Sequence, residues 1–286
     1  MPELPEVELA ATHLRTAWLG VRIAEVWLEL PCTAPGLEGL KRVEGSVLLN
    51  VRRHGKQLAL DFEGSLTLLL HLGMTGRFET CADGRLPPHT RFALVAQTGT
   101  AVAFRDPRRF ARSVLCSTVE ADRQPAWQRL GPDALAADIE EWVIALRTAS
   151  PLKPTLLDQH RIAGVGNIYA SEALWLAGLD PRATASTLTG QEIARLRTAV
   201  QAAMWETLRR EGDTAMRYLS DGGLENPFQV YGRAGEPCPR CARPILRITQ
   251  AGRSTWYCAA CQPARSGDPD PARSRGATFR RGCPAP

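Results

Sequence analysis

The sequence predicts an α+β protein of two domains: an N-terminal helix with an antiparallel β-sandwich, then a helical domain that ends in a cysteine-bearing β-hairpin. Short β-type runs follow one another in the first part of the chain with no helix between them, which is typical of an antiparallel sandwich or barrel. Helical periodicity replaces the strand signal beyond residue 131. Two cysteine pairs follow near the C-terminal end. The chain of 286 residues is long enough for about two domains, each with its own core.

Residues 5–19 are predicted to form the first helix. Its apolar residues recur at spacings of four, three and four, which places them on one helix face. They are Val7, Ala11, Leu14 and Trp18. Gly20 is expected to end the helix.

Six short runs rich in Val, Leu and Phe, separated by Gly and Pro, are predicted to be strands. They cover residues 21–30, 46–53, 57–62, 65–72, 90–97 and 100–105. The segments 36–39 and 82–88 are predicted loops.

Helices are predicted over residues 138–148, 154–160, 167–178, 189–210 and 214–220. Thr189, with Glu192 three residues later, makes a capping box at the start of one of them. A glycine-containing turn at 160–167 joins two short helices, and this arrangement is similar to a helix-turn-helix.

Composition changes at 119–133, which we expect to link an N-terminal domain (1–118) to a helical domain (134–228). The cysteine module covers 229–262. The tail 263–286 is rich in Pro, Ala and Arg and has almost no large apolar side chains, so we expect a disordered basic tail.

The net charge is +5, and the basic residues concentrate at the C-terminal end. Ten Arg face three acidic residues between 233 and 286, so the rest of the chain is near neutral. An anionic polymer is therefore a candidate partner, with solvated charge alone as the simpler alternative. No apolar run approaches the ~18 residues of a membrane span and no signal-peptide pattern begins the chain, so we expect a cytoplasmic protein.

Cys238 and Cys241 form one C-x-x-C pair, and Cys258 and Cys261 form a second pair after sixteen residues. This spacing matches a four-cysteine zinc site, with redox cysteines or disulfides as the alternatives. Four sulfur ligands leave no open position, so the expected Zn²⁺ is structural. The flanked residues form a predicted hairpin, with Arg253 beside its turn. The remaining cysteines are expected to be ordinary reduced thiols: Cys32, Cys81, Cys116 and Cys283.

Met1 precedes a small residue, so we expect its removal. Pro2 then carries a terminal secondary amine beside the carboxylate of Glu3. An α-amino group titrates near about 8, so a useful fraction is nucleophilic at neutral pH. Attack on a sugar aldehyde carbon gives an iminium ion, which permits elimination. The structural alternative is that Pro5 opens a helix whose N-terminus Glu3 and Glu6 favour.

Further motifs suit nucleic-acid binding, and each has a simpler explanation. Lys56, in a turn between strands, can reach a phosphate or stay solvated. Met74 projects from a turn with two glycines, or it fills the core. Arg108 can contact a base edge and Phe110 can enter a base stack, or their loop is merely salt-bridged. Asn167 begins a helix that can bind an anion, or it is an ordinary cap.

Together these motifs resemble the bacterial formamidopyrimidine-DNA glycosylase family over residues 2–262. The resemblance rests on segments in the family's order: 2–8, 54–56, 71–76, 106–110, 164–172, 229–233 and the four cysteines. It implies a β-sandwich domain, a helix-two-turn-helix domain and a zinc ribbon. It also implies a bifunctional DNA glycosylase/AP lyase of base excision repair. Such an enzyme removes 8-oxoguanine and formamidopyrimidines that stand opposite cytosine in double-stranded DNA.

The resemblance implies a role for individual residues. Pro2 forms a Schiff base with C1′ of the damaged nucleotide, Glu3 moves protons, and β,δ-elimination cuts the strand. Phosphates near the lesion are held by Lys56, Arg253 and Asn167, the first two within the catalytic centre. The gap left by the flipped base is filled by Met74, Arg108 and Phe110. His89 matches a further DNA-contacting position, and a monomer is expected.

Two departures leave the choice of lesion open. The segment 212–227 matches the family's lesion-recognition loop but is short, and Arg217 stands where a lysine is expected. Because of this segment, the runner-up is an endonuclease VIII-like enzyme for oxidised pyrimidines, although Leu4 stands where that group typically has Gly. Separately, the tail 263–286 extends past the usual end of the family and is expected to strengthen non-specific DNA binding. A non-catalytic damage-binding paralogue is the third possibility, against which the retained catalytic residues argue.

Overall fold

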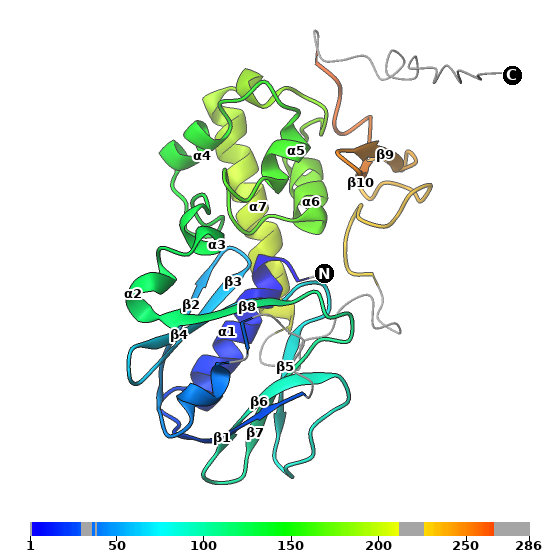
Figure 1. The fold of residues 1–286 in the computed structure, drawn as a ribbon. Helices are drawn as coiled ribbons and strands as arrows, with labels where there is room; N and C mark the ends of the chain where they lie inside the picture. The colour runs from blue at the N-terminus through cyan, green and yellow to red at the C-terminus, as the bar shows by residue number, and fades with distance from the viewer. Residues whose placement is uncertain (1, 30–35, 38, 212–225, 266–286) are drawn as a thin grey trace, which may run out of the picture.

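A computed structural model describes residues 2–29, 36–37, 39–211 and 226–265 (Figure 1). In Figure 1 the strands of the sandwich, the first helix and a short helix at residues 118–121 form the lower half, and the larger helices form the upper half. A two-stranded hairpin lies beside the upper half. The helix predicted over 214–220, nearly all of the segment 212–227 and most of the tail 263–286 lie outside the described residues.

The first helix, α1 (Leu4–Trp18), agrees with the prediction to within one residue at each end. Pro5 stands in its first turn, where a missing N–H breaks no intrahelical bond. Gly20 follows its end with φ +79°, a conformation that favours glycine. The four apolar residues of the predicted face are all buried in the core of the sandwich.

Two four-stranded antiparallel sheets form the sandwich. One sheet has the order β1 (Ile23–Leu28), β6 (Thr90–Ala96), β7 (Ala101–Arg105) and β5 (Arg77–Cys81). The other has the order β2 (Leu48–His54), β3 (Gln57–Phe62), β4 (Leu66–His71) and β8 (Arg112–Ser117). All six predicted strands form. The prediction missed β5 and β8, both edge strands in which polar residues make up half or more of the sequence.

Two short helices, α2 (Thr118–Ala121) and α3 (Pro125–Gln128), occupy the predicted linker and were not predicted. The larger helices are α4 (Ile139–Ala145), α5 (Leu152–Leu157), α6 (Asn167–Ala177) and α7 (Gly190–Glu211). Single 3₁₀ turns lie at Leu40–Val43 and Ala185–Thr187. The predicted capping box forms: Thr189 N–H donates to Glu192 Oε2 at 2.8 Å, and Glu192 N–H donates to Thr189 Oγ1 at 3.4 Å. The predicted domain boundaries stay predictions.

The terminal hairpin consists of β9 (Leu246–Gln250) and β10 (Arg253–Tyr257). Ala251 and Gly252 between them both have positive φ, 46° and 72°, as a tight hairpin turn requires. A small apolar cluster around Trp175 and Ile245 packs this module against α6.

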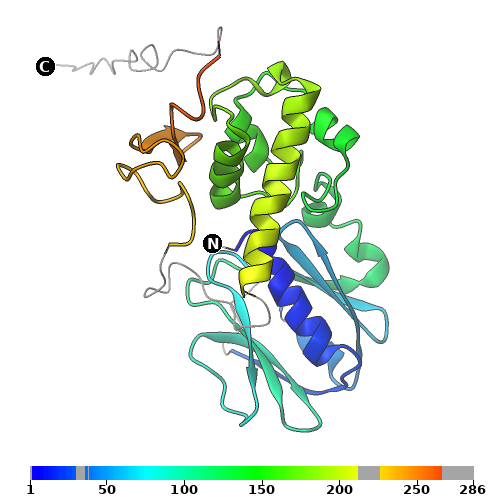
Figure 2. The same ribbon diagram turned by 180° about the vertical axis from the view of Figure 1, so that it is seen from behind.

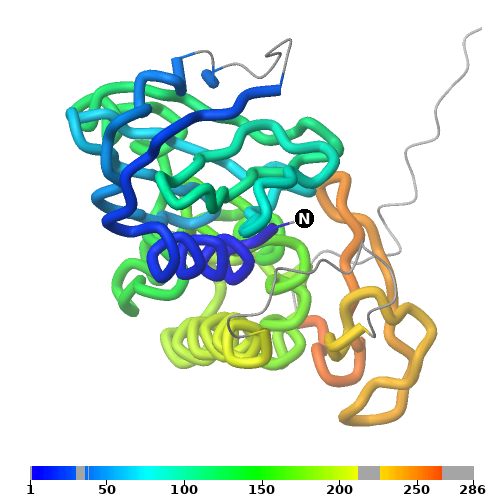
Figure 3. Tube along the Cα trace, turned by 90° about the horizontal axis from the view of Figure 1, so that it is seen from below, coloured from blue at the N-terminus to red at the C-terminus, as the bar shows by residue number. Residues whose placement is uncertain are grey.

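The two halves of the molecule meet at the beginning of α1. Figures 2 and 3 show this helix between the strands and the helical half, with α7 beside it. Val7 and later residues pack into the sandwich, whereas Leu4 is fully buried in the core of the helical half. The residues that precede Leu4 are therefore held at the junction. Among the described residues, none of the helices has the length and apolar character of a membrane span.

Candidate active site

The carboxylate of Glu3 lies at the N-terminus of α6. It accepts hydrogen bonds from the backbone N–H of Ile168 at 2.9 Å and of Tyr169 at 3.3 Å. These are two of the N–H groups that a helix leaves without an intrahelical partner. A Cβ on Gly166 would stand 2.2 Å from Glu3 Cδ, so glycine is needed here for the carboxylate to approach the helix. Glu3 is 1% exposed.

The turn at 164–167 therefore differs from the predicted site for an external anion. Two of the free N–H groups in the first turn of α6 already bind the protein's own carboxylate. Gly166, not Asn167, is the cap residue. Asn167 begins the helix, and its buried Oδ1 has no hydrogen-bond partner among the described residues. Asn167 therefore brings an uncommitted amide oxygen to the site, and its contact with DNA stays a prediction.

Pro2 is buried next to a second carboxyl group, which the sequence argument treated only as a helix-start residue. Glu6 Oε2 accepts from the Glu3 N–H at 2.8 Å, and Glu6 Oε1 accepts from the Tyr169 hydroxyl at 3.0 Å. Burial, and then the nearby charge of Glu3, raises the pKa of Glu6 to about 7. The region around Pro2 can therefore take up a proton near neutral pH.

Lys56 reaches the same junction from the β2–β3 turn. Its Nζ donates to the carbonyl of Val165 at 3.0 Å, and the residue is 8% exposed. Burial lowers the pKa of Lys56, the charge on Glu3 opposes this shift, and Arg253 adds to it. The turn sits this close because Gly55 carries no side chain: its Cβ would stand 2.7 Å from Ala163 Cβ.

The hairpin that carries Arg253 is fixed by a lysine for which the sequence suggested no role. Lys153 Nζ donates to the Ser254 carbonyl at 2.8 Å and to Thr255 Oγ1 at 3.0 Å. Lys153 is 1% exposed, and burial lowers its pKa to about 7. Arg253 itself is exposed at the start of β10. Pro2, Glu3, Lys56, Asn167 and Arg253 thus come together from separate segments.

A second group of predicted residues lies on two adjoining turns of the sandwich. No arginine of the described ranges forms a salt bridge with Asp106: its carboxylate accepts from Thr75 Oγ1 at 2.5 Å and from the Ala111 N–H at 2.8 Å. It thereby ties the turn of Met74 to the turn of Arg108 and Phe110. The guanidinium of Arg108 lies 4.8 Å from the Phe110 ring centre, and Phe110 is 51% exposed.

His89 is exposed and has φ +66°, and its carbonyl accepts from the Asp106 N–H at 3.1 Å. It therefore adjoins this second group rather than the buried junction. The roles of both groups in DNA binding stay predictions.

Two further functional candidates escaped the sequence argument. His71 Nδ1 accepts from the Gly73 N–H at 3.0 Å, so Nε2 carries the ring hydrogen. Burial, followed by the charges of Lys56 and Arg112, lowers the pKa of His71 to about 4 and keeps it neutral. Glu172 accepts from three successive N–H groups, of residues 229–231, at 2.8, 2.9 and 2.9 Å. Both lie inside motifs used for the resemblance, and that was the available signal.

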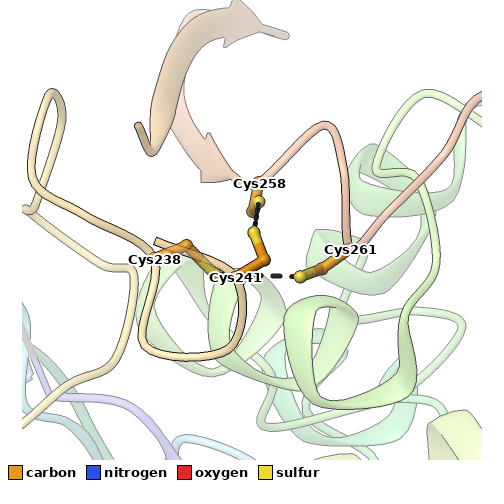
Figure 4. Close-up of side chains that lie close together, drawn as sticks. All are labelled: Cys238, Cys241, Cys258 and Cys261. Carbon is orange, nitrogen blue, oxygen red and sulfur yellow. Dashed lines mark hydrogen bonds between the residues drawn. The ribbon is translucent and has the colours of Figure 1, made fainter. Parts of the chain in front are cut away.

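The four paired cysteines converge on one point (Figure 4). Their sulfur atoms all lie within 4.8 Å of one another, with Cys238–Cys261 at 3.8 Å and Cys241–Cys258 at 3.4 Å. A tetrahedron of Zn–S bonds of about 2.3 Å fits such separations. Although burial opposes it, hydrogen bonds from the Arg240 backbone and the Trp175 indole lower the pKa of Cys238 to about 6.

Models of three parts of one enzyme family match consecutive segments of the chain. They are the formamidopyrimidine-DNA glycosylase N-terminal domain at 1–113, its H2TH domain at 130–218, and the zinc finger found in FPG and IleRS at 235–264. The formamidopyrimidine-DNA glycosylase of Gluconobacter oxydans is 39% identical, over 92% of this chain and 100% of the relative. That of Thermus thermophilus is 41% identical, over 92% of this chain and 98% of the relative. The chain belongs to the formamidopyrimidine-DNA glycosylase family.

Solved structures agree with this membership. The crystal structure of MutM (FPG) of Thermus thermophilus has a TM-score of 0.77 and 39% identity, with 91% of this chain and 98% of that chain covered. Lactococcus lactis Fpg in complex with DNA containing N7-benzyl-Fapy-dG has a TM-score of 0.81 and 29% identity, with 92% and 100% covered. As a member of the family, the chain is a DNA glycosylase with AP lyase activity. The predicted fold class and the structural zinc are confirmed.

Proposed function

We propose that the enzyme begins catalysis with the secondary amine of Pro2, after removal of Met1, and that it acts on oxidised purines in double-stranded DNA. 8-Oxoguanine and formamidopyrimidines are the proposed lesions, because related enzymes have been solved with carbocyclic 8-oxo-G and Fapy-dG DNA. The observation that carries the proposal is the convergence of Pro2, Glu3 and Lys56 at the junction of the two halves.

In the proposed reaction the Pro2 nitrogen attacks C1′ of a flipped-out nucleotide, and the N-glycosidic bond breaks. The base leaves with the bonding electrons and takes up a proton. Opening of the sugar ring gives an iminium ion between Pro2 and C1′. Loss of a C2′ proton then expels the 3′ phosphate by β-elimination, and δ-elimination expels the 5′ phosphate. Glu3 moves protons in these steps, held beside the amine by α6.

Flipping a base out of a duplex costs a few kcal/mol and leaves a gap in the stack. We assign Met74, Arg108 and Phe110 to that gap because Asp106 holds their two turns together on the surface. Lys56, Asn167 and Arg253 are assigned to phosphates, which fix the position of the damaged nucleotide. His89 is assigned to a DNA contact beside them. We further propose that the enzyme acts as a monomer on cellular DNA, which sedimentation of the free protein tests.

Borohydride trapping tests the chemistry and the substrate together. The purified protein is reduced on a duplex with one 8-oxoguanine opposite cytosine and, in parallel, on a dihydrouracil duplex. We expect a covalent adduct with the 8-oxoguanine duplex, located at Pro2 by mass spectrometry of the N-terminal peptide. An adduct mainly with dihydrouracil would make the enzyme endonuclease VIII-like. Lactococcus lactis Fpg has been solved with DNA containing an oxidised pyrimidine, so this arm is informative.

Matched variants separate catalysis from folding. Glu3→Gln is expected to slow base release by roughly 100-fold, within the range for loss of a general acid–base. Glu25→Gln, on the exposed face of β1, is expected to leave the rate unchanged. Tight lesion binding without any adduct would instead indicate a non-catalytic damage-binding protein.

A further inference from the structure

A cleft of about 630 Å³ continues from the proposed DNA-binding surface toward the linker helices. Met74 and Phe110 of the proposed DNA-binding surface line it, together with Gln124 and His160. Its floor is the outer face of the sheet where β4 and β8 pair. None of the described residues that line it is acidic, whereas Lys56 and Arg112 are basic. The cleft is therefore suited to an anion.

Arg112 supplies charge that the proposed mechanism does not use. It pairs in register with His71 on the neighbouring strand, so both side chains lie on the same face of the sheet. Arg112 is exposed, and its guanidinium has no ion pair or hydrogen bond to any residue of the described ranges. Its charge is close enough to lower the pKa of His71. The unpaired guanidinium and the Nε2–H of His71 thus face the cleft together.

His160 offers the cleft a further hydrogen-bonding group. His160 Nδ1 lies 2.7 Å from the Arg129 carbonyl and must donate to it, because a carbonyl only accepts. Nε2 of the same ring is left for a ligand. The lining of the cleft therefore offers polar groups besides Lys56.

We propose that this cleft binds the DNA backbone beyond the nucleotides that flank the lesion, with Arg112 as its charged phosphate contact. The inference rests on the proposed function, because Met74 and Phe110, which are assigned to the gap in the duplex, line the same cleft. The DNA strand that runs on from Met74 and Phe110 is then the nearest polyanion. Arg112 then contributes affinity that is independent of sequence and lesion, since phosphates carry no sequence information.

Salt-dependent binding tests the assignment. Arg112→Gln, Arg112→Lys and Arg147→Gln are compared with the unaltered enzyme on a duplex with a tetrahydrofuran abasic analogue and on an undamaged duplex. Arg147 is also exposed and lies outside the cleft, so its variant loses the same charge elsewhere. We expect Arg112→Gln to reduce the slope of log K against log salt by about 0.9 on both duplexes. Arg112→Lys and Arg147→Gln should keep the slope.

Shortening the duplex from each end in turn locates the contact. On the side that occupies the cleft, shortening should remove the difference between Arg112→Gln and the unaltered enzyme. An unchanged slope for Arg112→Gln, or an equal loss for Arg147→Gln, would overturn the proposal. Borohydride trapping of the unaltered enzyme is measured separately, so failure of the proposed chemistry is distinguished from failure of the cleft assignment.

Discussion

The position of Glu3 near the start of the chain depends on a helix that is distant in the sequence. Its carboxylate is positioned by the N–H groups of α6, and Gly166 makes the space for it. Gly166→Ala is expected to displace the carboxylate and lower the single-turnover rate by roughly 100-fold. Gly190→Ala is the control, because a Cβ at Gly190 meets nothing within 4 Å. Equal rates for the two variants would show that the approach of Glu3 to α6 does not matter for catalysis.

Glu6 predicts a pH dependence of stability. Its pKa rises from 4.5 to about 7 on folding, chiefly because of burial. A raised pKa stabilises the fold below the unfolded value, and this contribution is lost as the pH rises through about 7. Between about pH 5 and pH 8 the loss amounts to about 2 to 3 kcal/mol. Urea unfolding of Glu6→Gln should lack this part of the pH dependence, whereas Glu25→Gln should retain it.

At the same scale, the motifs predicted Pro2 and Glu3 as site residues but did not predict the buried residues around them. Pro2 and Glu3 carry recognisable chemistry whatever their surroundings. Glu6 and Lys153 matter because they are buried, and their partners lie 163 and 101 residues away in the chain. Burial of a charged side chain against such a distant segment has no local sequence pattern.

The zinc hairpin depends on a helix outside it. The indole N–H of Trp175 on α6 donates to Cys238 Sγ at 3.4 Å, and Trp175 is 4% exposed. Such partners outside the ligand set tune metal affinity, and their loss typically costs about 10–100-fold. Trp175→Phe should therefore speed zinc release to a chromogenic chelator roughly 10-fold. Trp205→Phe, at a position 58% exposed, should not, and equal release from both variants would rule out the indole–thiolate contribution.

Element prediction succeeded where one pattern dominated. The central strands and α1 have continuous or periodic apolar residues. The cysteine spacing predicted the zinc site, and the residues between the two cysteine pairs predicted the hairpin. The edge strand β8 and the four-residue helices α2 and α3 had no such pattern. They form because the rest of the sheet and the helical half surround them, and the cleft containing Arg112 was consequently not foreseen.

On the scale of the whole molecule, the site is assembled only when the two halves are correctly placed. Arg53 on β2 bridges them: its guanidinium pairs with Glu8 on α1 and with Asp133 before the helical half. Asp133 Oδ2 also accepts from the Gly55 N–H at 2.8 Å, next to Lys56. This network therefore sets the position of Lys56 relative to the 164–167 turn.

Asp133→Asn tests that coupling, because it removes one charge from a pair whose side chains are only 10% and 13% exposed. Burial opposes ionisation, but hydrogen bonds and charge from Arg53 hold the pKa of Asp133 below its ordinary value. Its contribution to stability is thus present near neutral pH and lost as the pH falls. We expect the variant to lower the free energy of unfolding near neutral pH by about 3 kcal/mol.

Asp122→Asn is the control: it removes a carboxylate that is 62% exposed beside Arg52 and should lower the free energy of unfolding by at most about 1 kcal/mol. Urea unfolding and single-turnover cleavage are measured on both variants. Equal stability and equal cleavage rates for Asp133→Asn and Asp122→Asn would contradict the coupling.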